Sequence, residues 1–245
     1  MIAFLREQLD YSRHPPSLKN IPESRYLMLC LQTIYQKLFD RYGRRNWWPA
    51  ESAFEMAVGA ILTQNSNWNN VEKAIANLRS ADALTCRKIC ALGREELEKL
   101  IRPAGFFRQK AERLQLFAGY LRDHYQGCLE KMLRQPLEPL REELLALKGI
   151  GPETADSMLL YAGERPSFVV DAYTGRLFSR LGLLRGDEKY EQIRSFFMTR
   201  LPAETGLYNE YHALIVAQCK EHCRKRPRCR GCPLEKDCNY RQQNP

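Results

Sequence analysis

Apolar residues recur along this chain at the spacing of α-helices. In the clearest early example Leu27, Leu31, Ile34 and Leu38 alternate with polar residues up to Gly43, which predicts a helix over 25–42. The two-residue alternation of half-buried strands is absent, and Phe168 to Val170 is the only β-like fragment. The pattern therefore predicts an all-α protein. Further helices are predicted over 51–63, around Val71, Ile75 and Leu78, and over 87–100, 107–124, 137–147, 172–183, 187–200 and 207–220.

The first residues, to about Glu23, are polar and contain the adjacent Pro15 and Pro16, which favours an extended lead-in. With 245 residues the chain is long enough for one large domain or two small ones. No run approaches the roughly 18 apolar residues that a membrane-spanning helix needs. The start has no secretory pattern. These features predict a soluble intracellular protein with no membrane partner.

The segment from Leu144 to Tyr161 predicts a helical hairpin. An apolar helix ends near Lys148, and Gly149 and Gly151 flank the single apolar residue Ile150. Pro152, at a first helical position, starts the next helix with Glu153 in its first turn. Glycines let a backbone approach an anion, and the N-terminus of a helix attracts one. The hairpin is therefore either a phosphate-binding site or an ordinary helix connection.

Asp171 follows the apolar fragment and precedes the predicted helix 172–183. An aspartate at this position is a favoured N-cap, because its carboxylate accepts hydrogen bonds from the first free amides of the helix. Capping and a chemical role are compatible, since a cap also holds the carboxylate in place.

The C-terminal region combines cysteines with positive charge. Cys223, Cys229, Cys232 and Cys238 have the spacing C-x5-C-x2-C-x5-C, which predicts either a [4Fe-4S] cluster or a zinc ion held by four thiolates. Zinc ribbons usually contain two close cysteine pairs, and this loop contains one, which favours iron-sulfur. The net charge of +9 favours a polyanionic partner. Arg226 and Arg228 in this loop are either phosphate contacts or part of a solvated surface.

The sequence G-I-G-P-E-T-A at 149–155, followed by V-V-D at 169–171, resembles the endonuclease III superfamily of helix-hairpin-helix DNA glycosylases. The resemblance implies two helical domains, one of 1–50 plus 167–245 and one of 51–166. The first would contain a cluster loop at 219–238, and the second, a six-helix barrel, would contain the hairpin at 140–163. It also implies that the DNA backbone is bound by Lys148, Gly149, Ile150 and Gly151, and that Asp171 is the catalytic carboxylate.

Two departures from the family pattern matter. Family members that also cut the strand have a lysine two residues after the second hairpin glycine, whereas this chain has Glu153. A carboxylate cannot form an imine, so we expect a monofunctional glycosylase. Many members have six residues in the first gap of the cysteine motif and this chain has five. That difference makes Cys219 an alternative to Cys223 as the first ligand, although we retain Cys223.

Further motifs resemble the bacterial 3-methyladenine DNA glycosylases of this superfamily: W-W-P, G-A-I-L-T-Q-N, V-V-D-A-Y and H-A-L-I-V. This resemblance implies that Gln64 enters the duplex. The cluster loop is closer to the wider superfamily, which leaves the substrate open. The implied base-pocket residues are Trp47, Trp48, Pro49, Trp68 and Lys220.

These features predict a monofunctional base-excision glycosylase for alkylated purines such as 3-methyladenine. Two alternatives remain, a glycosylase for mismatched or oxidised bases with or without lyase activity, and a non-catalytic iron-sulfur DNA-binding protein. The expected partner is double-stranded DNA that contains a damaged base. We expect a monomer in the bacterial cytoplasm, associated with the nucleoid.

Overall fold

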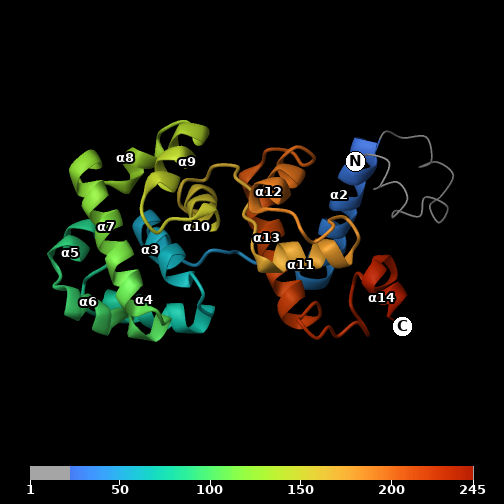
Figure 1. The fold of residues 1–245 in the computed structure, drawn as a ribbon, viewed down its shortest axis with the longest axis horizontal. Coiled ribbons are helices and arrows are strands. Elements are labelled where there is room, and N and C mark those ends of the chain that lie inside the picture. Colours follow the sequence, from blue (N-terminus) through green and yellow to red (C-terminus); the bar gives the residue numbers. More distant parts are fainter. Residues whose placement is uncertain (1–22, 245) are drawn as a thin grey trace. The chain divides into compact units, whose positions relative to one another are not determined.

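A computed structural model describes residues 23–244, and the expected lead-in lies outside them (Figure 1). Helices and loops make up this part of the chain, which contains no strand, so the all-α prediction is confirmed. Phe168, Val169 and Val170 are buried and belong to no helix or strand.

The chain divides into two compact units. In the described residues one unit contains 23–47 and 168–244, and the other is Trp48–Ser167. The sequence placed these boundaries at 50/51 and 166/167. We describe each unit separately, as the hairpin unit (Trp48–Ser167) and the Asp171 unit (23–47 and 168–244).

The hairpin unit has one apolar core, which includes Ile61, Leu78, Leu114 and Leu144. The expected helix over 87–100 is two helices, because Leu92 is extended and Gly93, a poor helix former, serves as the N-cap of the second. The short helix Leu129–Leu133 was not predicted. The helices of this unit are α3 (Ala53–Thr63), α4 (Trp68–Ser80), α5 (Cys86–Ala91), α6 (Arg94–Ile101), η3 (Arg102–Ala104), α7 (Phe107–Tyr125), α8 (Leu129–Leu133), α9 (Leu137–Ala146), α10 (Pro152–Ser157) and the π-helical turn η4 (Met158–Ala162).

The Asp171 unit joins distant parts of the sequence, since the blue α2 and the orange α11 both pack against α13 (Figure 1). Phe168 is central to its core and stacks on Phe197 with ring centroids 4.1 Å apart. The helices are α2 (Glu23–Tyr42), α11 (Ala172–Arg180), α12 (Tyr190–Met198), α13 (Thr205–Glu221), η5 (Glu235–Asp237) and α14 (Asn239–Gln243).

Two helices of this unit are shorter than expected. Helix α11 ends at Arg180 because Gly182 has φ +79°, outside the helical region. Helix α12 begins only at Tyr190, since the Glu188 carboxylate accepts hydrogen bonds from the amides of Arg185 and Gly186 and holds the preceding residues in a turn.

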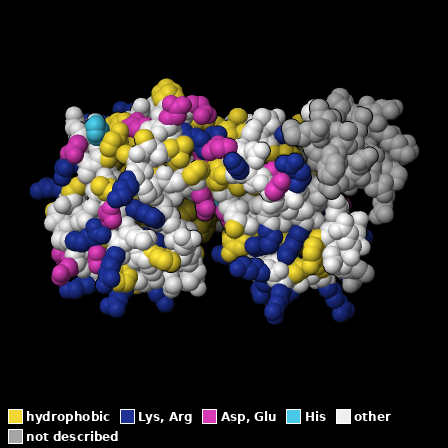
Figure 2. Space-filling view, viewed as in Figure 1, with side chains coloured by type: hydrophobic (Ala, Val, Ile, Leu, Met, Phe, Trp, Pro, Cys, Tyr) yellow, Lys and Arg dark blue, Asp and Glu magenta, His cyan; other side chains and the backbone are white. Residues whose placement is uncertain are grey.

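Lys and Arg side chains are spread over the surface of both units (Figure 2), in keeping with the net charge of +9. Across residues 23–244 no helix has both the length and the apolar character needed to cross a membrane.

Candidate functional site

The hairpin between α9 and α10 is a tight turn, and only glycine fits at position 149. The amide of Ile150 donates to the Leu147 carbonyl at 3.0 Å, and the Ile150 side chain is buried. Gly149 has φ +89°, and a Cβ there would lie 2.5 Å from Cγ of Arg113. Both the backbone conformation and the neighbouring side chain therefore require glycine at this position. Gly151 is the N-cap of α10, with Pro152 at the first helical position as expected.

A buried ion pair fixes the two hairpin helices to each other. Arg141 on α9 donates to both carboxylate oxygens of Asp156 on α10, at 2.8 and 3.0 Å. The Ser167 hydroxyl donates to the same carboxylate. Loss of one partner would leave a buried charge uncompensated, so this pair strongly couples α9 to α10. The hairpin is therefore held as a rigid element.

Gln64, which ends α3, contacts the hairpin directly. Its amide nitrogen donates to the Gly149 carbonyl at 3.0 Å and to Oγ1 of Thr154 at 2.9 Å, and Arg113 donates to its amide oxygen. Gln64, which we expect to fill the gap left by a flipped base, is therefore hydrogen-bonded to the hairpin that we expect to bind DNA. Nothing in the local sequence around Gln64 indicates this long-range contact.

Lys148 projects from the hairpin with 79% of its side chain exposed. It pairs with Glu112 at 2.7 Å, and this hydrogen bond lowers the pKa of the Glu112 carboxyl. Water screens an exposed ion pair of this kind, so Lys148 can exchange it for a phosphate at little cost.

Asp171 caps α11, as the sequence predicts. Its Oδ1 accepts from the Thr174 amide at 2.7 Å and from the Thr174 hydroxyl at 2.9 Å. The buried residues Phe168 to Val170 anchor the backbone before it. The carboxylate is therefore held from both sides of the chain, with 13% of its side chain exposed.

His212 on α13 is a second neighbour of this carboxylate, and no role for it was predicted from the sequence. Its Nε2 lies 3.6 Å from Oδ2 of Asp171, and its side chain is 10% exposed. Burial acts to raise the pKa of Asp171, but His212 and Thr174 outweigh it and hold that pKa below its ordinary value. Asp171 is therefore an anion across the physiological pH range. The H-A-L-I-V motif contained this histidine, and only the fold brings it to Asp171.

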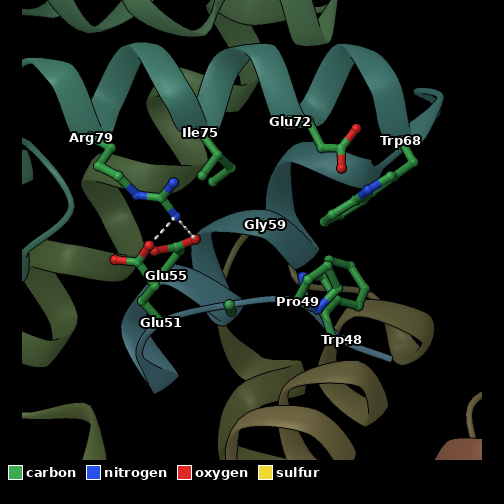
Figure 3. A pocket seen from close by; sticks show the side chains of 10 residues that line it. Trp48, Pro49, Glu51, Glu55, Gly59, Trp68, Glu72, Ile75 and Arg79 are labelled. Carbon is green, nitrogen blue, oxygen red and sulfur yellow. Dashed lines mark hydrogen bonds and ion pairs between the residues drawn. The ribbon is translucent and has the colours of Figure 1, made fainter. Parts of the chain in front are cut away.

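A cavity of about 490 Å³ opens beside the indoles of the hairpin unit (Figure 3). The rings of Trp48 and Trp68 meet edge to face with centroids 4.8 Å apart. Gly59 on α3 allows this arrangement, because a Cβ there would lie only 3.2 Å from Trp48. The tryptophans thus form one wall of the cavity, and Pro49 also lines it.

The rest of the cavity is acidic. Arg79 pairs with Glu55 at 2.7 Å and Glu51 at 3.3 Å (Figure 3). Glu72, one helical turn after Trp68 on α4, points into the cavity and forms no ion pair or hydrogen bond with any described residue. Three carboxylates and one guanidinium therefore leave a net negative lining in a protein of net positive charge.

The structure gathers only part of the expected base pocket in this cavity. Trp48, Pro49 and Trp68 line it. Trp47 and Lys220 belong to the Asp171 unit and are not among the lining residues.

The cysteine loop follows α13, and donors from the same unit point at its sulfurs. Arg180 donates to Sγ of Cys223 at 3.3 Å, and Gln218 donates to Sγ of Cys232 at 3.1 Å. The Cys238 thiol lies 3.5 Å from the Arg180 carbonyl. Burial raises the pKa of Cys232 and Cys238, and the neighbouring cysteines raise both further. The cysteines therefore lie near enough to influence each other electrostatically.

Cys219 and Cys223 differ in their environments. A hydrogen bond with Cys219 lowers the pKa of Cys223, as does Arg180, whereas the pKa of Cys219 is raised by the same pairing and by burial. Cys219 thus favours the protonated form and Cys223 the thiolate, which is the form that ligates metals. Within residues 23–244 no set of three or more candidate ligands converges on a single metal ion.

Around the cysteine loop the basic residues are on the surface. Arg226 and Arg228 are exposed, and the Arg228 backbone is fixed by hydrogen bonds to His222.

Phe106 is a surface feature that the sequence reading missed. Its side chain is 62% exposed, and it adopts φ +47° at the start of α7, directly after Gly105 at φ +69°. A large apolar residue is rarely exposed in a strained conformation without a function. The P-A-G-F-F sequence contains the signal, an aromatic residue directly after a turn glycine.

Comparison with known sequences places these features in context. Residues 58–203 match the family described as the HhH-GPD superfamily of base excision DNA repair proteins. Over 207 residues the chain is 50% identical to the Methanocaldococcus jannaschii protein named "Putative DNA repair glycosylase MJ1434", covering 84% of this chain and 94% of that protein. It is also 30% identical over 195 residues to endonuclease III of Sulfolobus acidocaldarius, covering 79% of this chain and 84% of that enzyme.

Two solved structures share the fold. The H. pylori 3-methyladenine DNA glycosylase bound to 1,N6-ethenoadenine has a TM-score of 0.67 at 29% identity, covering 81% of this chain and 98% of that one. An endonuclease III trapped in a covalent intermediate with DNA has a TM-score of 0.76 at 25% identity, covering 91% of this chain and 99% of that one.

Proposed function

Because this chain belongs to the HhH-GPD superfamily of base excision DNA repair proteins and is a DNA glycosylase, we propose that it is a monofunctional enzyme that hydrolyses the N-glycosidic bond of alkylated purines. The observation that carries the proposal is the carboxylate of Asp171, which is fixed at the N-cap of α11 and kept ionised by its neighbours.

Asp171 supplies the charge that the reaction needs. Cleavage of the N-glycosidic bond develops positive charge on the deoxyribose, and a fixed carboxylate stabilises that charge or takes a proton from the attacking water. The Thr174 donors keep one carboxylate oxygen in place before the substrate arrives. Little reorganisation is then required at the moment of bond breaking.

Glu153 supports a reaction that stops at the abasic site. It lies exposed in the first turn of α10, at the position where strand-cutting relatives of this family have lysine. A carboxylate cannot form an imine with the sugar, so bond cleavage by β-elimination has no amine at this position.

The cavity beside Trp48 and Trp68 supports an alkylated purine as substrate. Indole faces stack on an extruded base and attract a cation. Alkylation at a purine ring nitrogen makes the base cationic, and the net negative lining near Glu72 favours such a base over a neutral one. The H. pylori relative, a 3-methyladenine glycosylase, agrees with this assignment.

We assign DNA contacts to exposed groups of both units. The hairpin backbone at Gly149, Ile150 and Gly151 would bind phosphates together with Lys148, and Arg226 and Arg228 would add salt-sensitive contacts. Gln64 would leave its hydrogen bonds with Gly149 and Thr154 to fill the gap left by the flipped base. Phe106 would act as an apolar wedge between bases, a role that its exposure permits.

We propose that Cys223, Cys229, Cys232 and Cys238 hold a [4Fe-4S] cluster. Four thiolates carry concentrated negative charge, and the donors from Arg180 and Gln218 suit such ligands. Zinc ribbons usually contain two close cysteine pairs, whereas only Cys229 and Cys232 are close in this loop, which favours the cluster over zinc. The cluster would order the loop that presents Arg226 and Arg228.

A panel of duplexes, each containing one defined lesion, tests the substrate. Purified protein in excess is incubated with 3-methyladenine, 7-methylguanine, hypoxanthine, uracil or oxidised pyrimidine duplexes, and the released base is quantified. We expect the fastest release from the cationic purines. Preferential release of uracil or an oxidised base would contradict the proposed substrate, and release of no base from any duplex would favour a non-catalytic DNA-binding role.

A further inference from the structure

We propose that His212 is a positioning residue, which holds Asp171 in the orientation that the glycosylase reaction requires. The inference rests on the proposed catalytic role of Asp171 and concerns the opposite oxygen from the one that caps the helix. Oδ1 of Asp171 is occupied by two donors of Thr174, whereas Oδ2 faces the imidazole of α13 at 3.6 Å.

Thr174 and His212 therefore restrain the carboxylate at different oxygens. Thr174 lies on the same helix as Asp171, so its two hydrogen bonds fix Oδ1 relative to α11 alone. The carboxylate turns as one plane about its Cβ–Cγ bond, and the contacts with Thr174 restrain that rotation from α11 only. His212 approaches Oδ2 from α13, so it adds a restraint from a second helix.

His212 is itself held firmly. It lies in the interior of α13, a helix of 17 residues, and its side chain is buried. The preceding residue, Tyr211, is fully buried and donates its hydroxyl to the Leu31 carbonyl of α2 at 2.8 Å. The imidazole is therefore placed by two packed helices and not by a loop, which suits a group that must position another.

The distance of 3.6 Å exceeds that of an ordinary hydrogen bond. Catalytic contacts are often long in the free enzyme and shorten when substrate is bound. In this assignment His212 touches neither the base nor the sugar and transfers no proton. It favours the ionised carboxylate and directs it towards the developing charge.

Other groups on α11 and α13 also lie near this carboxylate. Thr174 contributes an amide and a hydroxyl from α11, and Cys219, on the same helix as His212, lies near enough for Asp171 to raise the pKa of its thiol as a minor contribution after Cys223 and burial. Arg176 of α11 acts on Cys219 in the opposite direction. Only His212 contacts Oδ2 in the described part of the unit.

Two substitutions separate positioning from folding. His212→Leu replaces the imidazole with an apolar side chain that has no donor. His212→Gln places an amide donor near the position of Nε2. We expect His212→Leu to slow single-turnover base release roughly 10- to 100-fold, the range typical of groups that orient a reactive ligand. His212→Gln should recover most of the rate. His124→Gln, an exposed histidine on α7, is the control and should match the wild type.

Binding and pH dependence provide the readouts that a structural role would not change. With a duplex containing a stable abasic analogue, Kd of His212→Leu should stay within about three-fold of the wild type, equivalent to less than 1 kcal/mol. The acid limb of its rate profile should move to higher pH, because the contact lowers the pKa of Asp171. If His212→Leu does not fold, the His212→Gln profile decides the question, since the proposal expects an acid limb close to that of the wild type.

Two outcomes would overturn the proposal. One is a folded His212→Leu enzyme with the wild-type rate and pH profile, and the other is a His212→Gln enzyme that folds and binds the duplex but recovers none of the activity. An Asp171→Asn variant is measured in parallel. If that variant excises normally, the proposed function fails, whereas an inactive Asp171→Asn beside a fully active His212→Leu overturns the inference about His212 alone.

Discussion

The carboxylates of Asp171 and Glu72 occupy opposite kinds of environment. Asp171 lies at the start of a helix with its side chain 13% exposed. Thr174 contacts one of its oxygens and His212 lies near the other. Glu72 lies on the exposed side of α4, at the edge of the cavity lined by Trp48 and Trp68, and pairs with no described group.

This difference indicates two uses for the same functional group. A carboxylate with a hydrogen-bonded oxygen and a close neighbour at the other is held in position, which suits stabilisation of charge at one atom of the substrate. A carboxylate that pairs with no protein group remains available to pair with a cationic ligand. We therefore assign bond breaking to Asp171 and selection of a cationic base to Glu72.

The largest effect should follow Asp171→Asn. Asparagine caps a helix about as well as aspartate, so the free energy of unfolding should change little. Loss of the charge should reduce single-turnover base release by roughly 100- to 10,000-fold. Asp171→Ala should be inactive and also less stable by about 1 kcal/mol, because it removes the cap. Thermal unfolding and base release, measured together on both variants, separate the two roles.

Trp68→Ala should have the next largest effect. Stacking of a base on an aromatic ring contributes about 1–3 kcal/mol, so the variant should bind and excise every lesion that enters this cavity more weakly. Trp68→Phe keeps a ring and serves as the control. An unchanged excision rate in Trp68→Ala would mean that the extruded base does not enter the cavity beside Trp48.

Glu72→Gln should act on charged bases alone. An exposed charge pair near 4 Å contributes about 1 kcal/mol, which corresponds to roughly a five-fold loss for a cationic purine. Excision of a neutral base such as hypoxanthine should not change. Glu96→Gln, an exposed glutamate on α6, is the matched control. Equal loss for charged and neutral bases would remove Glu72 from the specificity assignment.

Thr174→Val should have the smallest effect, about 0.5–1.5 kcal/mol for one hydrogen bond. The amide of residue 174 still caps the helix, so the fold should be kept. The pKa of Asp171 lies below its ordinary value, so the stability from its contacts is complete above the unfolded-state pKa of about 3.9 and is lost as pH falls through the lower folded-state pKa. Loss of the hydroxyl raises the folded-state pKa. Acid unfolding and the acid limb of the rate should therefore both begin at higher pH in Thr174→Val.

The sequence was most informative where local rules decide the structure. Helical periodicity located most of the helices, and the rule for N-caps identified the backbone position of Asp171. Gly93 shows the limit of helical periodicity. The apolar pattern continues from α5 into α6, although Gly93 is the N-cap of α6 and separates the two helices.

Contacts between residues that are far apart in the chain could not be predicted from the sequence. The partners of Asp171 and Gln64 come from elements 41 and 85 residues away, respectively His212 and Gly149. Glu72 was missed for another reason, since a glutamate on the polar face of a helix looks like ordinary solvated charge. Only the position of Trp68 one turn earlier gives it a cavity to face.

The most direct test of the account asks whether hydrolysis occurs without a covalent enzyme intermediate. Protein and a duplex with one 3-methyladenine are incubated with sodium borohydride, which fixes any imine between an enzyme amine and the sugar. Released base and covalent protein–DNA complex are quantified in the same samples. Glu153→Lys, which restores the amine found in strand-cutting relatives, serves as the comparison. We predict base release, no covalent complex for the natural chain, and strand breaks only after alkali. A borohydride-fixed complex of the natural chain would contradict the account, because it would place an active amine in a site that we assign to Asp171 alone.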